Sequence, residues 1–436
     1  MTMKKDIRKP DPLMKIGLLG IAPALLVSLP VLAQTTSPRG KPPEAKGLEW
    51  NQWRGPRRDG ISPDTGLLNQ WPPAGPPLVW KATGLGEGYS GVSFGGERIF
   101  TMGDLEGTCS IVALDLSGKK LWTAPVGRPG GGGGYPGPRC TPATDGTLVF
   151  ALGQHGDLVC AEAATGKVVW KKSLPGDFGG KMMSGWGFSE SPLLDGNVLA
   201  CTPGGPRGTV LALNKATGAV LWQSRELTDS AAYASLVPVD HGGVHQYIVL
   251  TDQSVAGIAA ADGKVLWRAE RRGRTAVITT PVFKDGFLYV TSAYGVGHHG
   301  FRVSAAGGRF QCEPIYSGRE MENHHGGVIL VGEHLYGMDQ RSMKCVELRT
   351  GKVVWQNRAV GKGSIAYADG HFVIRAEGGN GTMALVEASP RGYVEKGRFD
   401  QPDRSDRNSW PHPVLFGGRM YIRDQDLLLC YNLRAK

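Results

Sequence analysis

The sequence lacks the cysteine arrangements that mark redox and haem proteins. Its seven cysteines include no adjacent pair, no Cys-x-x-Cys and no Cys-x-x-Cys-His. This excludes thioredoxin-like redox motifs and c-type haem attachment. Three cysteines, at 160, 345 and 430, recur at one position of a repeat where other copies carry alanine or glycine, so we interpret them as small buried side chains. The state of the other four stays open: Cys109, Cys140, Cys201 and Cys312.

The sequence also lacks a phosphate-binding motif and extended clusters of basic residues. The glycine run at 130–134 is not followed by Gly-Lys-Ser or Gly-Lys-Thr, so it is not a phosphate-binding loop. We interpret it as a flexible loop, or as half of a lid formed with the insertion at 178–186. The net charge of +10 comes from scattered Lys and Arg with one short cluster at 271–274. The charge therefore does not indicate nucleic-acid binding.

The N-terminus has the order of a secretory signal peptide: basic residues, an apolar run from Ile16 to Leu32, then Ala33. We predict residues 1–33 as the signal peptide, with cleavage after Ala33. Two prolines interrupt the run, and the residue directly after the cleavage point is Gln34 and not cysteine, so we expect neither a retained transmembrane anchor nor a lipid anchor. The predicted location is periplasmic or secreted. Residues 34–75, rich in Pro, Gly and Arg, are expected to form an extended tail around the outer rim.

One motif recurs along the chain: a small residue, an apolar residue, then usually an acid or amide, a Gly-containing turn, and a tryptophan four positions after the glycine. The tryptophans of the clear copies are Trp122, Trp170, Trp222, Trp267 and Trp355. Thr-Gly and Asp-Gly pairs supply the positive φ angles of tight hairpins, and a second hairpin precedes each copy. Four short strands at this spacing are typical of a propeller blade.

The last unit ends one strand short, whereas the segment around Trp80 has the tryptophan strand without a preceding hairpin. We predict that these two strands pair and close the ring, which removes two exposed sheet edges. With Phe310 and Tyr393 counted as degenerate anchors, the sequence predicts an all-β, eight-bladed propeller over residues 76–436, with four antiparallel strands per blade. Six tryptophans are expected to pack between blades: Trp80, Trp122, Trp170, Trp222, Trp267 and Trp355.

The repeat resembles that of pyrroloquinoline quinone (PQQ) repeat propellers, a family that includes quinoprotein alcohol dehydrogenases and BamB-type outer-membrane assembly factors. The resemblance covers roughly residues 50–436. Four segments are similar to exported propellers labelled PQQ-like or polyvinyl-alcohol-dehydrogenase-like: Trp53-Arg54-Gly55-Pro56, Gly88-Tyr89-Ser90, 323–327 and 423–427. The resemblance implies the fold more firmly than a reaction, because this propeller serves both enzymes and scaffolds.

Quinoprotein alcohol dehydrogenases carry adjacent cysteines, a calcium site of Glu, Asn and Asp, and a catalytic Asp. This chain has no adjacent cysteines and no acidic cluster with calcium-like spacing. We therefore predict a non-catalytic, monomeric propeller without a cofactor, which binds a protein partner or a small polar ligand, an assembly scaffold of the BamB kind being one case. The alternative is a quinoprotein dehydrogenase that uses PQQ with calcium to oxidise an alcohol or sugar. No catalytic residue is assigned.

The residues just before each innermost strand should converge on one mouth of the central funnel. With a tryptophan of the 178–186 insertion, they give this candidate site: Arg139, Trp186, Glu190, His324, His325, Trp410 and His412. In one interpretation these side chains hydrate the channel or bond neighbouring blades. In the other they bind a polar ligand, with Arg139 as anion clamp, Trp186 or Trp410 as stacking surface, and His324 or His412 as base.

The histidine pairs at 298–299 and 324–325 are candidate metal ligands, because they are the densest imidazoles in the chain. Adjacent side chains on a strand point to opposite faces, so a pair can hold one ion only from a loop. No carboxylate follows either pair at a ligand-like interval. The sequence therefore predicts no metal site.

Overall fold

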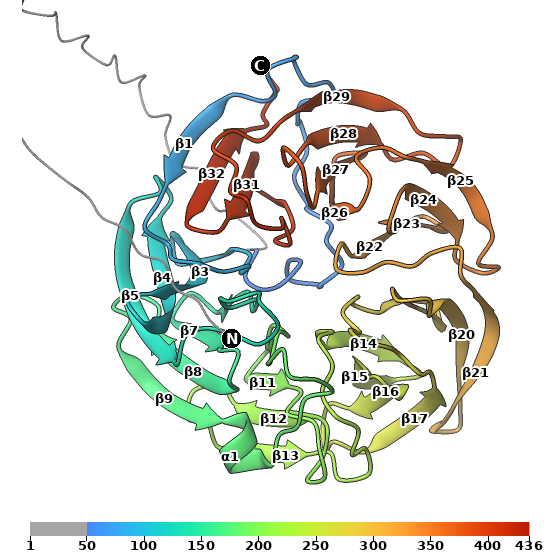
Figure 1. The fold of residues 1–436 in the computed structure, drawn as a ribbon. Helices are drawn as coiled ribbons and strands as arrows, with labels where there is room; N and C mark the ends of the chain where they lie inside the picture. Colours follow the sequence, from blue (N-terminus) through green and yellow to red (C-terminus); the bar gives the residue numbers. More distant parts are fainter. Residues whose placement is uncertain (1–49, 436) are drawn as a thin grey trace, which may run out of the picture. The chain divides into compact units, whose positions relative to one another are not determined.

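Each repeat folds into one four-stranded antiparallel sheet, because Gly-containing turns join short runs of apolar and β-branched residues into successive hairpins. The computed structural model describes residues 50–435, which are almost entirely β-structure. Eight such sheets are arranged as blades around one axis (Figure 1). The predicted eight-bladed propeller with four antiparallel strands per blade is confirmed.

We number the blades along the chain and list their strands from the axis outward. Blade 1 contains β2 (Ser93–Gly95), β3 (Arg98–Leu105), β4 (Thr108–Asp115) and β5 (Lys120–Gly127). Blade 2 contains β6 (Ala143–Thr144), β7 (Leu148–Leu152), β8 (Asp157–Glu162) and β9 (Val168–Ser173). Blade 3 contains β10 (Leu193–Asp195), β11 (Val198–Cys201), β12 (Leu211–Asn214) and β13 (Val220–Gln223). Blade 4 contains β14 (Val237–His241), β15 (Val244–Leu250), β16 (Ser254–Ala259) and β17 (Val265–Glu270).

The second half of the ring repeats this plan. Blade 5 contains β18 (Val282–Lys284), β19 (Phe287–Ser292), β20 (Gly297–Ala306) and β21 (Arg309–Gly318). Blade 6 contains β22 (Val328–Val331), β23 (His334–Met338), β24 (Met343–Glu347) and β25 (Val353–Asn357). Blade 7 contains β26 (Gly363–Ala368), β27 (His371–Ala376), β28 (Met383–Glu387) and β29 (Glu395–Phe399). Blade 8 contains β30 (Val414–Phe416), β31 (Arg419–Asp424), β32 (Leu427–Asn432) and β1 (Leu78–Ala82).

One short helix, α1 (Leu174–Phe178), follows β9 and is capped at its N-terminus by the Ser173 side chain. Within residues 50–435, no helix has the length and apolar character needed to cross a membrane. The predicted signal peptide and residues 34–49 of the predicted tail lie outside the described residues.

The ring is closed by strands from the two ends of the propeller, as predicted. β1 pairs antiparallel with β32, and Trp80 stands opposite Cys430. This is the register of the other blades, in which Trp170, for example, stands opposite Cys160. The closing blade therefore follows the same pattern of small residue and tryptophan as the continuous blades.

The repeat tryptophans lie against the turn of the following blade. The Trp80 indole donates to the carbonyl of Leu116 (3.2 Å), and its ring would lie 2.7 Å from a Cβ added at Gly118. The same relation holds for Trp170 and Gly218. Only glycine fits under the indole, which explains why the turn glycine and the tryptophan recur together. Trp267 differs, because its indole donates to Gln246 of its own blade (2.7 Å).

Both degenerate anchors, Phe310 and Tyr393, were wrong. In blade 5 the tryptophan position is held by Tyr316, opposite Gly300, because the β20–β21 hairpin is longer and Phe310 lies near its turn. In blade 7 the position is held by Gly397, opposite Leu385, whereas Tyr393 precedes the outer strand. The repeat count was right even though these two side chains do not occupy the anchor position.

The cysteines of the repeat are small core residues. Cys160, Cys345 and Cys430 are fully buried opposite their tryptophans, as expected from the alanines of other copies. All seven cysteines are free thiols, and Cys312 alone is partly exposed.

The predicted path of the tail around the outer rim was wrong for residues 50–62. This segment crosses the centre of the ring (blue in Figure 1). Gln52 bonds to Leu194 in blade 3, Arg54 donates to the carbonyl of Val328 in blade 6 (2.6 Å), and Arg58 donates to the carbonyl of Leu236 before β14 (3.0 Å). The innermost strands leave backbone carbonyls facing the axis, and the two buried guanidinium groups supply donors for them.

Candidate functional site

A cavity of about 260 Å³ lies on the axis, at the end of the ring where the chain enters each innermost strand. The segments that lead into the eight innermost strands all contribute residues to its wall, and the central segment contributes Trp53. Trp53 is fixed there by its indole, which donates to Thr280 (3.3 Å), and by contact with the His412 ring at 4.7 Å. The segment that fills the axis thus also limits the depth of the cavity.

The structure brings six of the seven predicted site residues to this one cavity: Arg139, Trp186, His324, His325, Trp410 and His412. Glu190 was placed wrongly and does not line it. Its side chain is 1% exposed and accepts a hydrogen bond from the backbone N–H of Thr202 in its own blade. Burial raises the pKa of Glu190 to about 7, although the nearby Arg58 opposes the shift. Glu190 belongs to the contact between blade 3 and the central segment.

Arg139 is held by carbonyl groups rather than by a carboxylate. Its guanidinium donates to the carbonyls of Trp186 (2.7 Å) and Tyr135 (2.8 Å) and lies 5.9 Å from the centre of the Trp410 ring. Within residues 50–435 it forms no ion pair with Asp or Glu. Burial lowers the pKa of Arg139, but a guanidinium keeps its charge at neutral pH. The cavity therefore presents a cation with no anionic partner.

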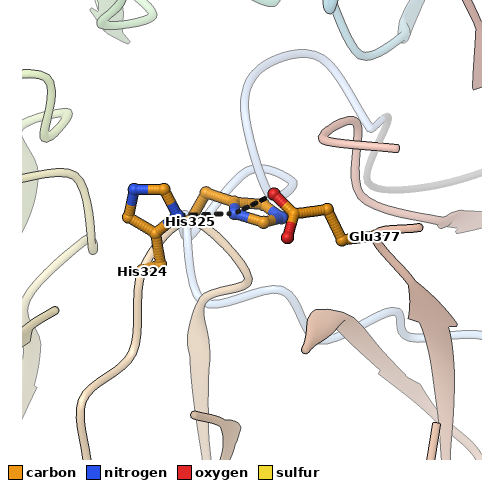
Figure 2. A group of neighbouring side chains, drawn as sticks. All are labelled: His324, His325 and Glu377. Atoms are coloured by element: carbon orange, nitrogen blue, oxygen red, sulfur yellow. Dashed lines mark hydrogen bonds and ion pairs between the residues drawn. The ribbon is translucent and has the colours of Figure 1, made fainter. Parts of the chain in front are cut away.

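Another part of the wall carries His324, His325 and Glu377 (Figure 2). The two Nδ1 atoms of the histidines are 3.3 Å apart, and His325 Nδ1 is 3.8 Å from Glu377 Oε1. Glu377 is also held by the Lys362 ammonium (2.8 Å to Oε2) and by the Trp410 indole (2.7 Å to Oε1). Lys362 is thus neutralised by Glu377, which leaves Arg139 as the uncompensated charge.

The histidines of the cavity are poor general bases at neutral pH. Burial lowers the pKa of His324 and of His412 to about 3, and that of His325 well below its usual range. His412 is held by a hydrogen bond between its Nε2 and the carbonyl of His325 (2.8 Å). A base works best when its pKa lies near the operating pH, so these imidazoles suit hydrogen bonding or ligation better than proton abstraction.

The predicted site residues leave out most of the aromatic wall, although Tyr233 was among the positions before innermost strands that were expected to converge on this mouth. Tyr89, Tyr135, Tyr233 and Tyr294 line the cavity together with the indoles of Trp53, Trp186 and Trp410. Tyr89 and Tyr135 both lie against Trp410, with ring centres 4.4 and 4.9 Å from it. Tyr89 and Trp53 belong to segments that carried the family resemblance, so a signal was present for these two. Tyr135 directly follows the glycine run, for which one interpretation was half of a lid, whereas Tyr294 lies in a turn where nothing in the sequence pointed to the axis.

The glycine run and the 178–186 insertion pack against each other beside the cavity. A Cβ at Gly132 would meet the carbonyl of Gly185 at 2.0 Å, and one at Gly133 would meet the Trp186 indole at 2.2 Å. Glycine is therefore required for this close approach. Tyr135 and Trp186, which end the two segments, both line the cavity.

The fold and its repeats make this chain a PQQ-repeat β-propeller. Residues 107–357 match the family described as outer membrane protein assembly factor BamB, and the chain belongs to this family. It is 26% identical to the tetrathionate hydrolase of Acidithiobacillus ferrooxidans over 272 residues, which cover 57% of this chain and 48% of that protein. It is 25% identical to the BamB of Yersinia pestis over 339 residues, which cover 72% of this chain and 78% of that protein.

The alignment thus spans about half the length of the tetrathionate hydrolase. Among solved structures, the quinohemoprotein alcohol dehydrogenase ADHIIG from Pseudomonas putida HK5 superposes with a TM-score of 0.61 at 12% identity, covering 89% of this chain and 81% of that one. At this identity the superposition shows the shared fold alone.

The cavity does not fit PQQ with calcium. Calcium takes about six to eight oxygen ligands, usually with several carboxylates. In the described residues Glu377 is the one carboxylate on the cavity wall, which is too few for a calcium site. The donor set that would hold the quinone and its ion is therefore missing from the wall.

Proposed function

We propose that this protein is a non-catalytic binding propeller of the bacterial envelope whose axial cavity binds a small ligand with a ring and an anionic group. The uncompensated charge of Arg139 beside the Trp410 ring is the observation that carries this proposal. A partly buried cation that is held by carbonyls can bind a carboxylate or phosphate through charge-assisted hydrogen bonds. Sugar acids and aromatic carboxylates share this chemistry.

The aromatic wall supports the ring component of the ligand. Trp186 lies near Tyr233 with ring centres 6.1 Å apart, and Tyr89 and Tyr135 surround Trp410. Ring faces of this kind stack on sugars and on aromatic ligands without large conformational entropy losses. The weak basicity of the cavity histidines argues for binding without turnover.

Titration of the full chain with paired acidic and neutral ligands tests this function. Tryptophan fluorescence should respond to sugar acids and aromatic carboxylates and much less to their neutral amides. Arg139→Gln should weaken binding of the acids by about 1.5–3 kcal/mol, as expected for loss of a charged hydrogen bond. Arg128→Gln is the matched control, because Arg128 contacts His155 and does not line the cavity. Equal affinity for acids and amides would contradict the proposal.

The alternative, a quinone-dependent dehydrogenase, is tested in parallel. Protein mixed with PQQ and calcium should show neither stoichiometric uptake nor reduction of a dye with alcohols or sugars. Stoichiometric uptake with dye reduction would favour the dehydrogenase over the binding protein.

A further inference from the structure

We propose that the cavity wall contains a binding site for one divalent transition-metal ion, with His324 Nδ1, His325 Nδ1 and Glu377 Oε1 as its protein ligands. The site uses a different part of the wall from Arg139, so the inference does not depend on the anionic ligand proposed above.

The fold removes both reasons for which the sequence predicted no metal. His324 and His325 lie in the loop between β21 and β22, so their side chains are not forced to opposite faces of a strand. The carboxylate comes from the end of β27 in the next blade, where Glu377 follows the last strand residue. Two adjacent blades thus bring together three ligand atoms, one from each residue, all within 4.8 Å of one another.

The spacing of these atoms is close to that of a tetrahedral site. With zinc–nitrogen bonds of about 2.0–2.1 Å, two nitrogen ligands at the tetrahedral angle are about 3.3–3.4 Å apart. The two histidine Nδ1 atoms are 3.3 Å apart, and the carboxylate oxygen is 3.8 Å from His325 Nδ1. Both distances are close to the separation of two ligands on one tetrahedral ion, and all three ligand atoms lie within 4.8 Å of one another.

Neighbouring groups orient the ligands as they do in known metal sites. His324 Nε2 is 3.0 Å from the hydroxyl of Tyr294, a contact that leaves Nδ1 for the metal when Nε2 carries the proton. Lys362 and Trp410 hold the Glu377 carboxylate in place. The Lys362 charge also opposes the bound cation, so we expect moderate affinity.

The donor set selects the class of metal. Two imidazoles and one carboxylate suit zinc and its neighbours in the first transition row, whereas calcium and magnesium prefer oxygen ligands throughout. All three residues line the cavity. A fourth coordination position therefore opens into the cavity, where water or a ligand can enter, which is typical of open rather than structural sites.

Calorimetry on the chelator-treated, tag-free full chain tests the site with Zn²⁺, and visible absorption tests it with Co²⁺. The wild type should bind one Zn²⁺ per chain, should give the d–d bands of tetrahedral Co²⁺, and should not bind Ca²⁺. His324→Gln and Glu377→Gln should each weaken Zn²⁺ binding at least tenfold. His334→Gln, in the β22–β23 hairpin away from the cavity, should bind as the wild type does.

Thermal melting of each variant without metal shows whether it is folded, and Glu377→Gln keeps the shape of the side chain. Failure of the wild type to bind Zn²⁺, or unchanged affinity in a folded His324→Gln protein, would overturn the metal site. Arg139→Gln should keep full Zn²⁺ binding while losing the anionic ligand. The two proposals can therefore fail separately.

Discussion

Trp71 lies directly against Gly397, the glycine that occupies the tryptophan position of blade 7. A Cβ added at Gly397 would lie 2.8 Å from the Trp71 Cβ. The Trp71 backbone N–H donates to the carbonyl of Lys396 (2.8 Å), and its ring contacts Phe399 with ring centres 5.5 Å apart. Trp71 is 4% exposed. Blade 7 therefore receives a tryptophan from the segment that precedes the first blade.

This relationship predicts that substitution by alanine lowers stability more at Gly397 than at Gly392. Gly397→Ala should destabilise the protein clearly, because the new methyl group collides with Trp71. Gly392→Ala is the matched control, since Gly392 also has a positive φ but has open space around its Cβ position. Urea unfolding followed by tryptophan fluorescence measures both. Equal losses would show that backbone conformation, and not contact with Trp71, limits position 397.

The tryptophans packed in the blades should matter more for stability than the one beside the cavity. Trp170→Ala and Trp267→Ala should each lower the free energy of unfolding by about 3–5 kcal/mol, as large-to-small core substitutions do. Trp186→Ala should cost much less, because its side chain is partly exposed at the cavity. Chemical denaturation of the three variants checks this order. Similar losses in all three would remove the distinction between packed and cavity tryptophans.

Two adjacent arginines test the central segment. Arg58 is 1% exposed and donates to the carbonyls of Leu236 and Ser191. Arg58→Met should lower the free energy of unfolding by about 2–4 kcal/mol, because buried carbonyls lose their donor. Arg57→Met is the control, since Arg57 is exposed and pairs only with Asp59 (2.8 Å), a contact worth about 1 kcal/mol or less. Indistinguishable midpoints would contradict a stabilising role of the segment.

The buried Glu190 predicts a pH-dependent stability difference. Its pKa is about 7 in the folded protein and 4.5 in an unperturbed chain. Between these values the folded state holds a proton that the unfolded state has lost, so the Glu190 contribution to stability falls as pH rises from about 4.5 to about 7. Glu190→Gln removes this loss and should be more stable than the wild type by about 1–3 kcal/mol above pH 7.

Melting curves of the two proteins from pH 4 to pH 8 measure the effect. The stability difference should grow between pH 4.5 and pH 7 and stay constant above. Glu313→Gln, an exposed substitution in β21, controls for the loss of one carboxylate. A difference that does not change with pH would show that Glu190 keeps an ordinary pKa in the folded state.

The blades could be predicted because their determinants are local. The turn glycine, the small residue and the tryptophan lie within about a dozen positions of each other, so five clear copies fixed the strand pattern and the ring closure. Blades 5 and 7 were harder, because a longer hairpin moved the anchor to Tyr316 and an anchor from outside the repeat, Trp71, replaced the one missing at Gly397. The anchor residue of a blade cannot be predicted from the repeat motif where it depends on the length of the hairpin or on contacts with distant segments.

The candidate site was predictable only as far as it follows from the repeat. Positions before the innermost strands reach one mouth of the ring, which placed Arg139, His324 and His412 together. The approach of Glu377 to His325 depends on how two neighbouring blades stack, and the path of Arg58 depends on backbone carbonyls that look alike in any sequence. These contacts form only in the folded ring, and no fixed spacing of residues along the sequence predicts them.

The pairing of β1 with β32 sets the order in which this ring can fold. Seven sheets consist of consecutive strands, so each can form early from local hairpins, whereas the eighth joins segments from nearly opposite ends of the propeller. Contacts of such large sequence separation form slowly, because the long intervening chain must be organised first. A nascent or truncated chain would therefore exist as an open arc of seven blades with unpaired strand edges, the form most prone to aggregate. The pairing of β1 with β32 is the step that converts this vulnerable intermediate into a closed structure.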